Sequence, residues 1–209
     1  MERNSIGWRA VVLGFVLCAV GVSTLAAAPV DRCDFRSDMR KLWEDHVTWT
    51  RLYIVSAVSN LPDKDATAQR LLQNQVDIGN AIKPFYGEAA GTKLSALLED
   101  HILIAVELIE AAKVGDTQKK EGAVEKWNAN ADAISAFLSA ANPANWPADE
   151  MKSMMREHLA LTTAEVVARL QKDTAAEIAA YEKVHGQILH MADQLSSGIV
   201  AQFPAKFGT

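Results

Sequence analysis

The chain has 209 residues, of which 49% are hydrophobic and 22% are charged, and its formal net charge is −5. This composition supports a folded domain with a sizeable core, and it excludes a disordered or low-complexity chain. The negative charge argues against a nucleic-acid-binding protein, because such proteins carry basic patches that neutralise phosphates.

Residues 1–28 have the three parts of a secretory signal peptide. Arg3 and Arg9 make the start positive, an apolar run "VVLGFVLCAVGV" follows, and "STLAAAP" ends the segment with small residues. The apolar run is short for a membrane span, so we expect cleavage, export and a periplasmic location. An uncleaved membrane anchor is the alternative. Two cleavage signals fit, Thr24-Leu25-Ala26 and Ala26-Ala27-Ala28.

Cleavage would leave an acidic protein with a single cysteine. Loss of two positive charges (Arg3, Arg9) and one negative charge (Glu2) takes the formal charge from −5 to −6. Cys33 then has no partner for an internal disulfide, so any disulfide would join two chains. The oligomeric state, a homo-oligomer included, is open at this point, as is the identity of any protein partner.

Residues 29–209 are predicted to form one all-α domain, an up-and-down bundle of about six helices. Short segments rich in Asp, Thr, Gly and Pro separate six stretches of helical pattern and no convincing strand. Paired in order, the stretches make three antiparallel hairpins, at about 34–84, 88–142 and 148–203. A four-helix bundle with an appended hairpin is the alternative. The six helices are expected at 34–59, 64–83, 88–113, 117–141, 148–171 and 174–202.

A histidine recurs on the apolar side of the first helix in each predicted hairpin. The segments "WEDHVTW", "LEDHILI" and "MREHLAL" place His46, His101 and His158 at spacings of 55 and 57 residues. Each histidine directly follows an acidic residue. A period of this length indicates an internal repeat whose units bury their apolar faces against one another.

A carboxamide follows each histidine after 29 residues: Gln75, Asn130 and Gln187. The midpoint of each interval falls in the predicted turn of the hairpin. Residues equidistant from the turn of an antiparallel hairpin lie at the same height. The sequence therefore predicts three His–amide pairs, each facing across its hairpin in the core.

Two functions fit these pairs. The leading hypothesis is a non-enzymatic binding or structural protein whose polar layer fixes helix register, because slippage would strand buried polar groups at about 1–3 kcal/mol each. The alternative is a bundle that binds a small ligand or a metal ion. If the three hairpins pack with threefold symmetry, His46, His101 and His158 could converge on Zn or Cu, with the amides orienting the rings.

A second metal hypothesis involves methionines. Met151, Met154, Met155 and His158 have i, i+3, i+4, i+7 spacing on one helix. Thioethers and imidazoles select Cu(I), although methionine also fills irregular core space. His185, His190 and Met191 lie on the partner helix. Glu182 and His185 supply only half of the carboxylate–histidine pattern of a di-iron bundle.

Other polar and aromatic residues favour ordinary roles. Asp77 and Asp132 recur at equivalent positions but point away from the apolar stripe, which predicts a solvated face. A set of aromatic residues would pack in the core or line a pocket. Phosphate-binding glycine loops, nucleophile elbows and HExxH and CxxC motifs do not occur, so an enzyme ranks third. The aromatic residues are Trp43, Trp49, Tyr53, Phe85 and Tyr86.

Residues 42–116 resemble a group of small bacterial helical proteins, often exported, of undetermined function. The run "RLLQNQVDIGNAIKPFYG" is the most specific part of the resemblance. Some members carry the labels glycosyltransferase or acetylglutamate kinase, but both enzyme classes use α/β domains with nucleotide sites that this pattern lacks. The resemblance implies a helical fold and assigns no catalytic residue.

Overall fold

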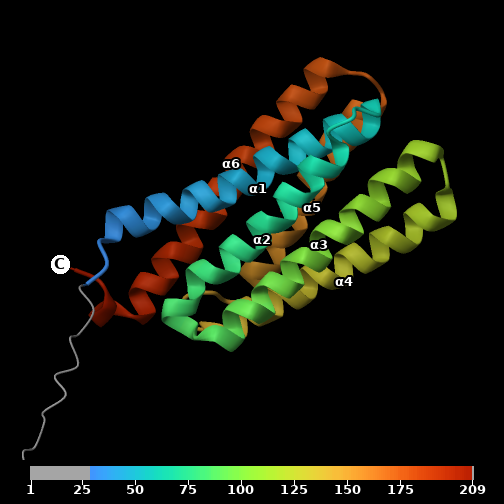
Figure 1. Cartoon of the computed structure of the whole chain (residues 1–209). Helices are drawn as coiled ribbons and strands as arrows, with labels where there is room; N and C mark the ends of the chain where they lie inside the picture. Colours follow the sequence, from blue (N-terminus) through green and yellow to red (C-terminus); the bar gives the residue numbers. More distant parts are fainter. Residues whose placement is uncertain (1–28, 209) are drawn as a thin grey trace, which may run out of the picture.

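The computed structural model describes residues 29–208, which form six long α-helices and one short 3₁₀ helix (Figure 1). The predicted signal peptide therefore lies outside the described residues. The helices are α1 (Arg32–Ser59), α2 (Lys64–Tyr86), α3 (Glu88–Val114), α4 (Thr117–Ala141), α5 (Ala148–Leu170) and α6 (Thr174–Gln202), followed by η1 (Pro204–Lys206).

The predicted up-and-down bundle of six helices is confirmed. Each helix packs against the next one along the chain, and α6 closes the ring against α1. The six helices thus form one bundle, and no hairpin is merely appended to a four-helix core. Helix α1 also contacts α3 and α5 across the middle, which brings together the three helices that carry the recurring histidines.

The three hairpin turns share one backbone arrangement. Asn60, Gly115 and Lys172 adopt left-handed conformations, with φ of 54°, 74° and 60°. The next residue in each turn donates its N–H to a carbonyl oxygen five residues back, at 2.9–3.0 Å. This hydrogen bond satisfies a carbonyl at the end of each helix and reverses the chain within a few residues. The three turns therefore reverse the chain in the same way.

Two helix ends differ from the sequence prediction. Helix α1 begins at Arg32, because the Asp31 carboxylate accepts hydrogen bonds from the N–H groups of Cys33 and Asp34 and caps the helix. Helix α2 continues through Pro84 to Tyr86 rather than stopping before the proline. Pro84 has no N–H to donate to the carbonyl group of Asn80, so the last turn of α2 lacks one helical hydrogen bond.

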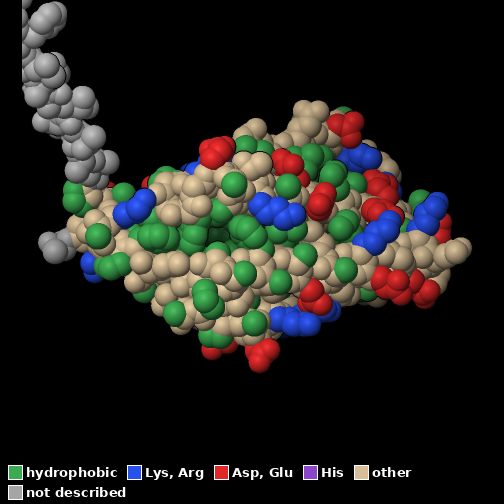
Figure 2. Space-filling view, turned by 90° about the horizontal axis from the view of Figure 1, so that it is seen from below, with side chains coloured by type: hydrophobic (Ala, Val, Ile, Leu, Met, Phe, Trp, Pro, Cys, Tyr) green, Lys and Arg blue, Asp and Glu red, His purple; other side chains and the backbone are tan. Residues whose placement is uncertain are grey.

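The hydrophobic core consists of two clusters of buried side chains. The surface of the bundle carries charges of both signs. Acidic and basic side chains are interspersed on the face seen in Figure 2, around a hollow lined by hydrophobic side chains. Within residues 29–208, no helix is both long enough and apolar enough to span a membrane.

The two ends of the described chain meet at the end of the bundle away from the hairpin turns (Figure 1). Val30 N–H donates to the Lys206 carbonyl oxygen, and Gly208 N–H donates to the Val30 carbonyl oxygen, both at 2.9 Å. Phe207 packs against Phe35 and Phe85, with ring centroids 5.2 and 5.3 Å away.

Candidate functional site

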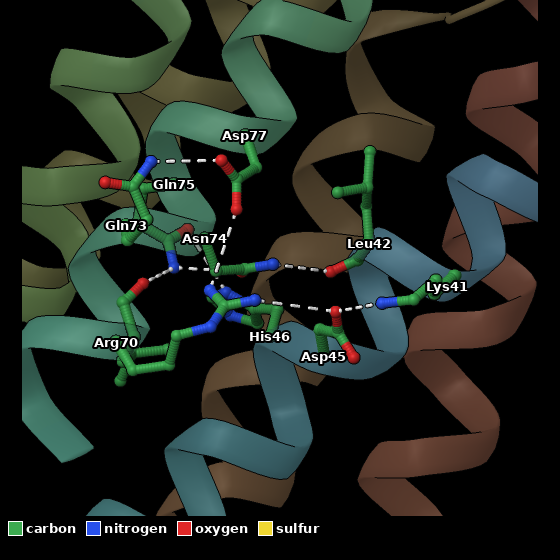
Figure 3. Close-up of polar contacts among 10 residues, drawn as sticks. Lys41, Leu42, Asp45, His46, Arg70, Gln73, Asn74, Gln75 and Asp77 are labelled. Carbon is green, nitrogen blue, oxygen red and sulfur yellow. Dashed lines mark hydrogen bonds and ion pairs between the residues drawn. The ribbon is translucent and has the colours of Figure 1, made fainter.

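Each recurring histidine donates a hydrogen bond to the amide 29 residues later. His46 Nδ1 lies 3.2 Å from Gln75 Oε1, and His158 Nδ1 lies 3.2 Å from Gln187 Oε1. His101 Nδ1 lies 2.8 Å from Asn130 Oδ1. The acids that precede the histidines face elsewhere: Asp45, for example, pairs with Lys41 and Arg70 on the outside of the first hairpin (Figure 3).

Backbone carbonyl groups fix the orientation of all three amides. The Asn130 amide NH₂ donates to the Leu97 carbonyl oxygen at 3.0 Å, and the Gln187 NH₂ donates to that of Met154 at 3.1 Å. Gln75 donates to the Leu71 carbonyl oxygen at 2.7 Å. Each amide therefore turns its oxygen toward the ring, and an oxygen can only accept.

The first hairpin divides this task between two residues. Asn74 donates to the Leu42 carbonyl oxygen at 2.9 Å (Figure 3). Leu42 lies four residues before His46, and Leu97 and Met154 have the same position relative to the histidines of the other two hairpins. Gln75 then bonds both His46 and the side-chain oxygen of Asn74. Every hairpin thus has the same pair of cross-helix hydrogen bonds.

These bonds determine the tautomer of the three imidazoles. Because the amide oxygens accept, each Nδ1 carries the proton and each Nε2 has a lone pair. Within the described part of the chain, none of the three Nε2 atoms has a hydrogen-bonding partner. The three rings therefore offer three acceptor atoms to the interior of the bundle.

The three rings meet at one level of the bundle. The ring centroid of His158 lies 5.7 Å from that of His46 and 6.2 Å from that of His101. Burial lowers the pKa of His101 to about 3 and that of His158 to about 4, and it holds the pKa of His46 well below its usual value. Nearby imidazoles lower the values for His46 and His101 further, so all three rings are neutral at pH 7.

A cavity of about 260 Å³ begins at this histidine layer. It runs between α3, α4 and α5 toward the hairpin turns, where the α3–α4 hairpin stands apart from α5 (Figure 1). Its walls are mainly aliphatic, and Val124 and Val167, 39% and 43% exposed, mark its mouth. The lining includes His46, His101 and His158 at the inner end, with Ile102, Ala105, Leu108, Ile109, Val166 and Leu170 along the walls.

Two residues that line the cavity also carry unpaired polar atoms that are inaccessible. Trp127 Nε1 and Thr162 Oγ1 make no hydrogen bond to any described residue. The Trp127 ring is tilted by 33° to that of His101, with centroids 5.2 Å apart, and Thr162 lies one turn after His158. Because three other buried atoms that make no hydrogen bond lie elsewhere in residues 29–208, on Trp43, Arg70 and Gln194, these two atoms do not by themselves mark a site.

The structure also locates the residues of the metal hypotheses. No group of three or more His, Cys, Asp or Glu side chains within residues 29–208 is spaced to hold a metal ion as the rings stand. Met151, Met154, Met155 and Met191 are buried in the main core and do not line the cavity. His185 pairs with Glu44 at 2.9 Å on the outside, and His190 is exposed.

The remaining candidates have structural surroundings. Asp77 is half-buried beside Arg70, and Asp132 forms an ion pair with Arg156 that links α4 to α5. Trp43 and Tyr86 border a void of only about 20 Å³. Trp49, Tyr53 and Phe85 pack in or against the two core clusters.

A buried ionic cluster was not anticipated from the sequence. The Arg51 guanidinium lies 3.1 Å from Glu165 and 3.0 Å from Glu177, and Arg169 lies 3.2 Å from Glu177. Glu165 and Glu177 are 1% and 2% exposed. Burial raises the pKa of Glu165 to about 7, although Arg51 opposes this shift.

Comparisons with protein-family models, curated proteins and solved structures find no match to this chain. The histidine layer and its cavity are therefore interpreted from their own geometry.

Proposed function

We propose that this protein is an exported, non-enzymatic binding protein that holds a small, mainly apolar molecule in the cavity between α3, α4 and α5. The observation that carries the proposal is the convergence of three imidazoles, each with an unpaired Nε2 atom, at the inner end of an aliphatic cavity. Export is supported by the signal-like pattern of residues 1–28.

A role in helix register alone does not account for the cavity. The His–amide bonds tie the hairpins together, and this needs only the Nδ1 side of each ring. The inner end of the cavity keeps the Nε2 atoms of His46, His101 and His158 without partners among the described residues. A ligand that fills this space would give these atoms partners, which favours binding over packing.

The first test is to block the cavity. Ala105 lies on its wall, and Ala105→Phe would fill it without adding a polar atom. The matched control is Ala129→Phe at an exposed position of α4. We expect wild type and control to release a near-stoichiometric small molecule on solvent extraction after native purification, or to bind the apolar fluorophore 1-aminoanthracene, and Ala105→Phe to do neither. Equal binding by all three proteins, or binding by none, would refute the proposal.

A metal ion is the second candidate, and the fixed tautomer favours it. Metal-bound histidines commonly donate their other ring nitrogen to a nearby oxygen, as all three rings do here. With metal–nitrogen bonds of about 2.0–2.1 Å, two imidazoles on a tetrahedral ion would have centroids about 5 Å apart, so the rings would have to move closer together.

Elemental analysis separates the two candidates. Zn or Cu bound at one equivalent in wild type, and lost in the triple variant His46→Gln, His101→Gln, His158→Gln, would establish the metal. A protein that remains metal-free after incubation with either ion but binds an organic molecule would rule out the metal and support the apolar ligand. Circular dichroism of the triple variant checks that its helices are retained.

A further inference from the structure

The shape of the cavity restricts what can enter it. Along α5 its lining residues recur every four positions, from His158 through Thr162 and Val166 to Leu170. Twelve residues of α-helix span about 18 Å, so the cavity follows the bundle axis for up to this distance. The cavity is therefore elongated along the bundle axis, with mainly aliphatic walls. This shape suits an extended apolar chain.

The inner end selects a hydrogen-bond donor. His46, His101 and His158 present lone pairs there, and all three are neutral and 2–4% exposed. A carboxylate has only acceptor atoms and would face three further acceptors. A hydroxyl group can donate to an Nε2 atom, which a carboxylate cannot do.

The mouth of the cavity favours a negatively charged group on the ligand. Among residues 29–208, Lys120 is the one charged side chain that lines the cavity, and it is exposed. It makes no ion pair with any residue in the range 29–208, whereas its neighbour Lys119 pairs with Asp116. A negative group at the outer end of a ligand would therefore have a free ammonium beside it, at a position that remains in contact with water.

From these features we infer that the ligand class is an unbranched alkyl chain with a hydroxyl group at the histidine layer and an anionic group at the mouth beside Lys120. This inference rests on the proposed binding function and specifies its ligand. The distance of up to about 18 Å along α5 from the histidine layer to Leu170 accommodates an extended chain of about ten carbons. We therefore choose 10-hydroxydecanoate as the probe.

The test compares three probes that differ only at their ends. Calorimetric titration with 10-hydroxydecanoate, decanoate and 1-decanol measures each end group separately. We expect decanoate to bind about 10- to 100-fold more weakly than 10-hydroxydecanoate, because it leaves the polar groups of the inner end unpaired. We expect 1-decanol to bind about 2- to 5-fold more weakly, because it lacks the charge that faces Lys120.

Variants assign the two ends. His101→Leu should reduce the preference for 10-hydroxydecanoate over decanoate to below about threefold, whereas Lys120→Gln should leave that preference intact and remove the preference over 1-decanol. Lys126→Gln, on the exposed side of α4, is the control. Each preference is a ratio of two affinities measured on the same variant, so a loss of stability in that variant would not by itself change the ratio.

Two results would overturn the inference. One is decanoate binding as tightly as 10-hydroxydecanoate to wild type. The other is the absence of binding by all three probes while another molecule binds in a manner that Ala105→Phe prevents; this outcome would leave the proposed binding function standing. If no molecule binds in either the cavity-blocking experiment or the titrations, the binding function itself is refuted.

Discussion

The Nδ1 atom of His46 lies 3.2 Å from Oε1 of Gln75, and the amide NH₂ of Gln75 donates to the Leu71 carbonyl oxygen at 2.7 Å. Gln75 thus contacts the imidazole through its oxygen and its own helix through its nitrogen. The same direction of donation recurs in all three hairpins, from ring to amide and from an amide to a backbone carbonyl.

Removal of this amide should destabilise the fold. Gln75→Leu keeps a similar volume but leaves the buried Nδ1–H of His46 unpaired, which costs about 1–3 kcal/mol. Gln73→Leu, two residues away on the exposed side, should change the free energy of unfolding by at most about 0.5 kcal/mol. Urea unfolding measures both. Equal effects of the two substitutions would show that the His46–Gln75 bond contributes nothing particular.

Acid should weaken the protein through its buried histidines. The pKa of His101 is lowered from 6.5 to about 3, so between these values the unfolded chain binds a proton that the folded chain does not. Stability gained from the neutral ring is complete above pH 6.5 and is lost as the pH falls toward 3. Each such histidine steepens the pH dependence by up to about 1.4 kcal/mol per pH unit.

Comparison with His101→Gln isolates this contribution. The difference in free energy of unfolding between wild type and variant should shrink as the pH falls from 6.5 to 4. The comparison is needed because Glu165 acts in the opposite direction: its raised pKa makes stability fall as the pH rises from 4.5 to about 7. A difference that does not vary with pH would mean that His101 is protonated equally in both states.

The buried ionic cluster should depend on Arg51 more than on Glu165. Within residues 29–208 Arg51 is the one arginine that pairs with Glu165, so Arg51→Met should cost about 3–5 kcal/mol at pH 8, where the carboxylate is ionised. The cost should be smaller at pH 5, where Glu165 takes up a proton. Glu165→Gln leaves the Arg51–Glu177 pair and should remove the fall in stability between pH 4.5 and 7. Thermal unfolding at both pH values tests this order.

The close contact between α2 and α3 should tolerate no side chain at Gly79. A Cβ atom there would lie 2.5 Å from the Gly91 carbonyl oxygen, so Gly79→Ala must push two helix backbones apart at a cost of about 1–3 kcal/mol. Gly122→Ala is the control: its Cβ would have no neighbour within 4 Å, and it should stabilise α4 by about 0.5–1 kcal/mol. Chemical denaturation should give opposite signs for the two variants.

Local sequence patterns account for the helices and for the position of each histidine opposite its amide. Both depend on counting residues from a turn, and the turns at Asn60, Gly115 and Lys172 have equivalent geometry. The start of α1 was less predictable, because it depends on the Asp31 side chain acting as a cap. Proline after a helical pattern predicts a helix stop, but α2 continues past Pro84 to Tyr86.

The cavity and the ionic cluster depend on how the hairpins pack, which no local pattern specifies. Trp127 and Thr162 have ordinary core positions in the sequence, and only the packing of α3, α4 and α5 makes both residues line a cavity. In the sequence, Glu165 and Glu177 resemble solvated helix residues. Their burial follows from the packing of α1 against α5 and α6, which places Arg51 between the two carboxylates. Sequence reasoning identified the three imidazoles but left open whether they meet.

The backbone hydrogen bonds between Val30 and the segment 206–208 make residues 29–208 nearly a closed loop. In a circular permutant of these residues, a short linker would join residue 208 to residue 29, and new ends would be opened at one of the three hairpin turns. Opening the α3–α4 turn would free the helix ends near the mouth of the cavity, whereas opening the α1–α2 turn would leave α3, α4 and α5 continuous. Circular permutation thus offers a way to loosen the mouth of the cavity without substituting any residue of the histidine layer.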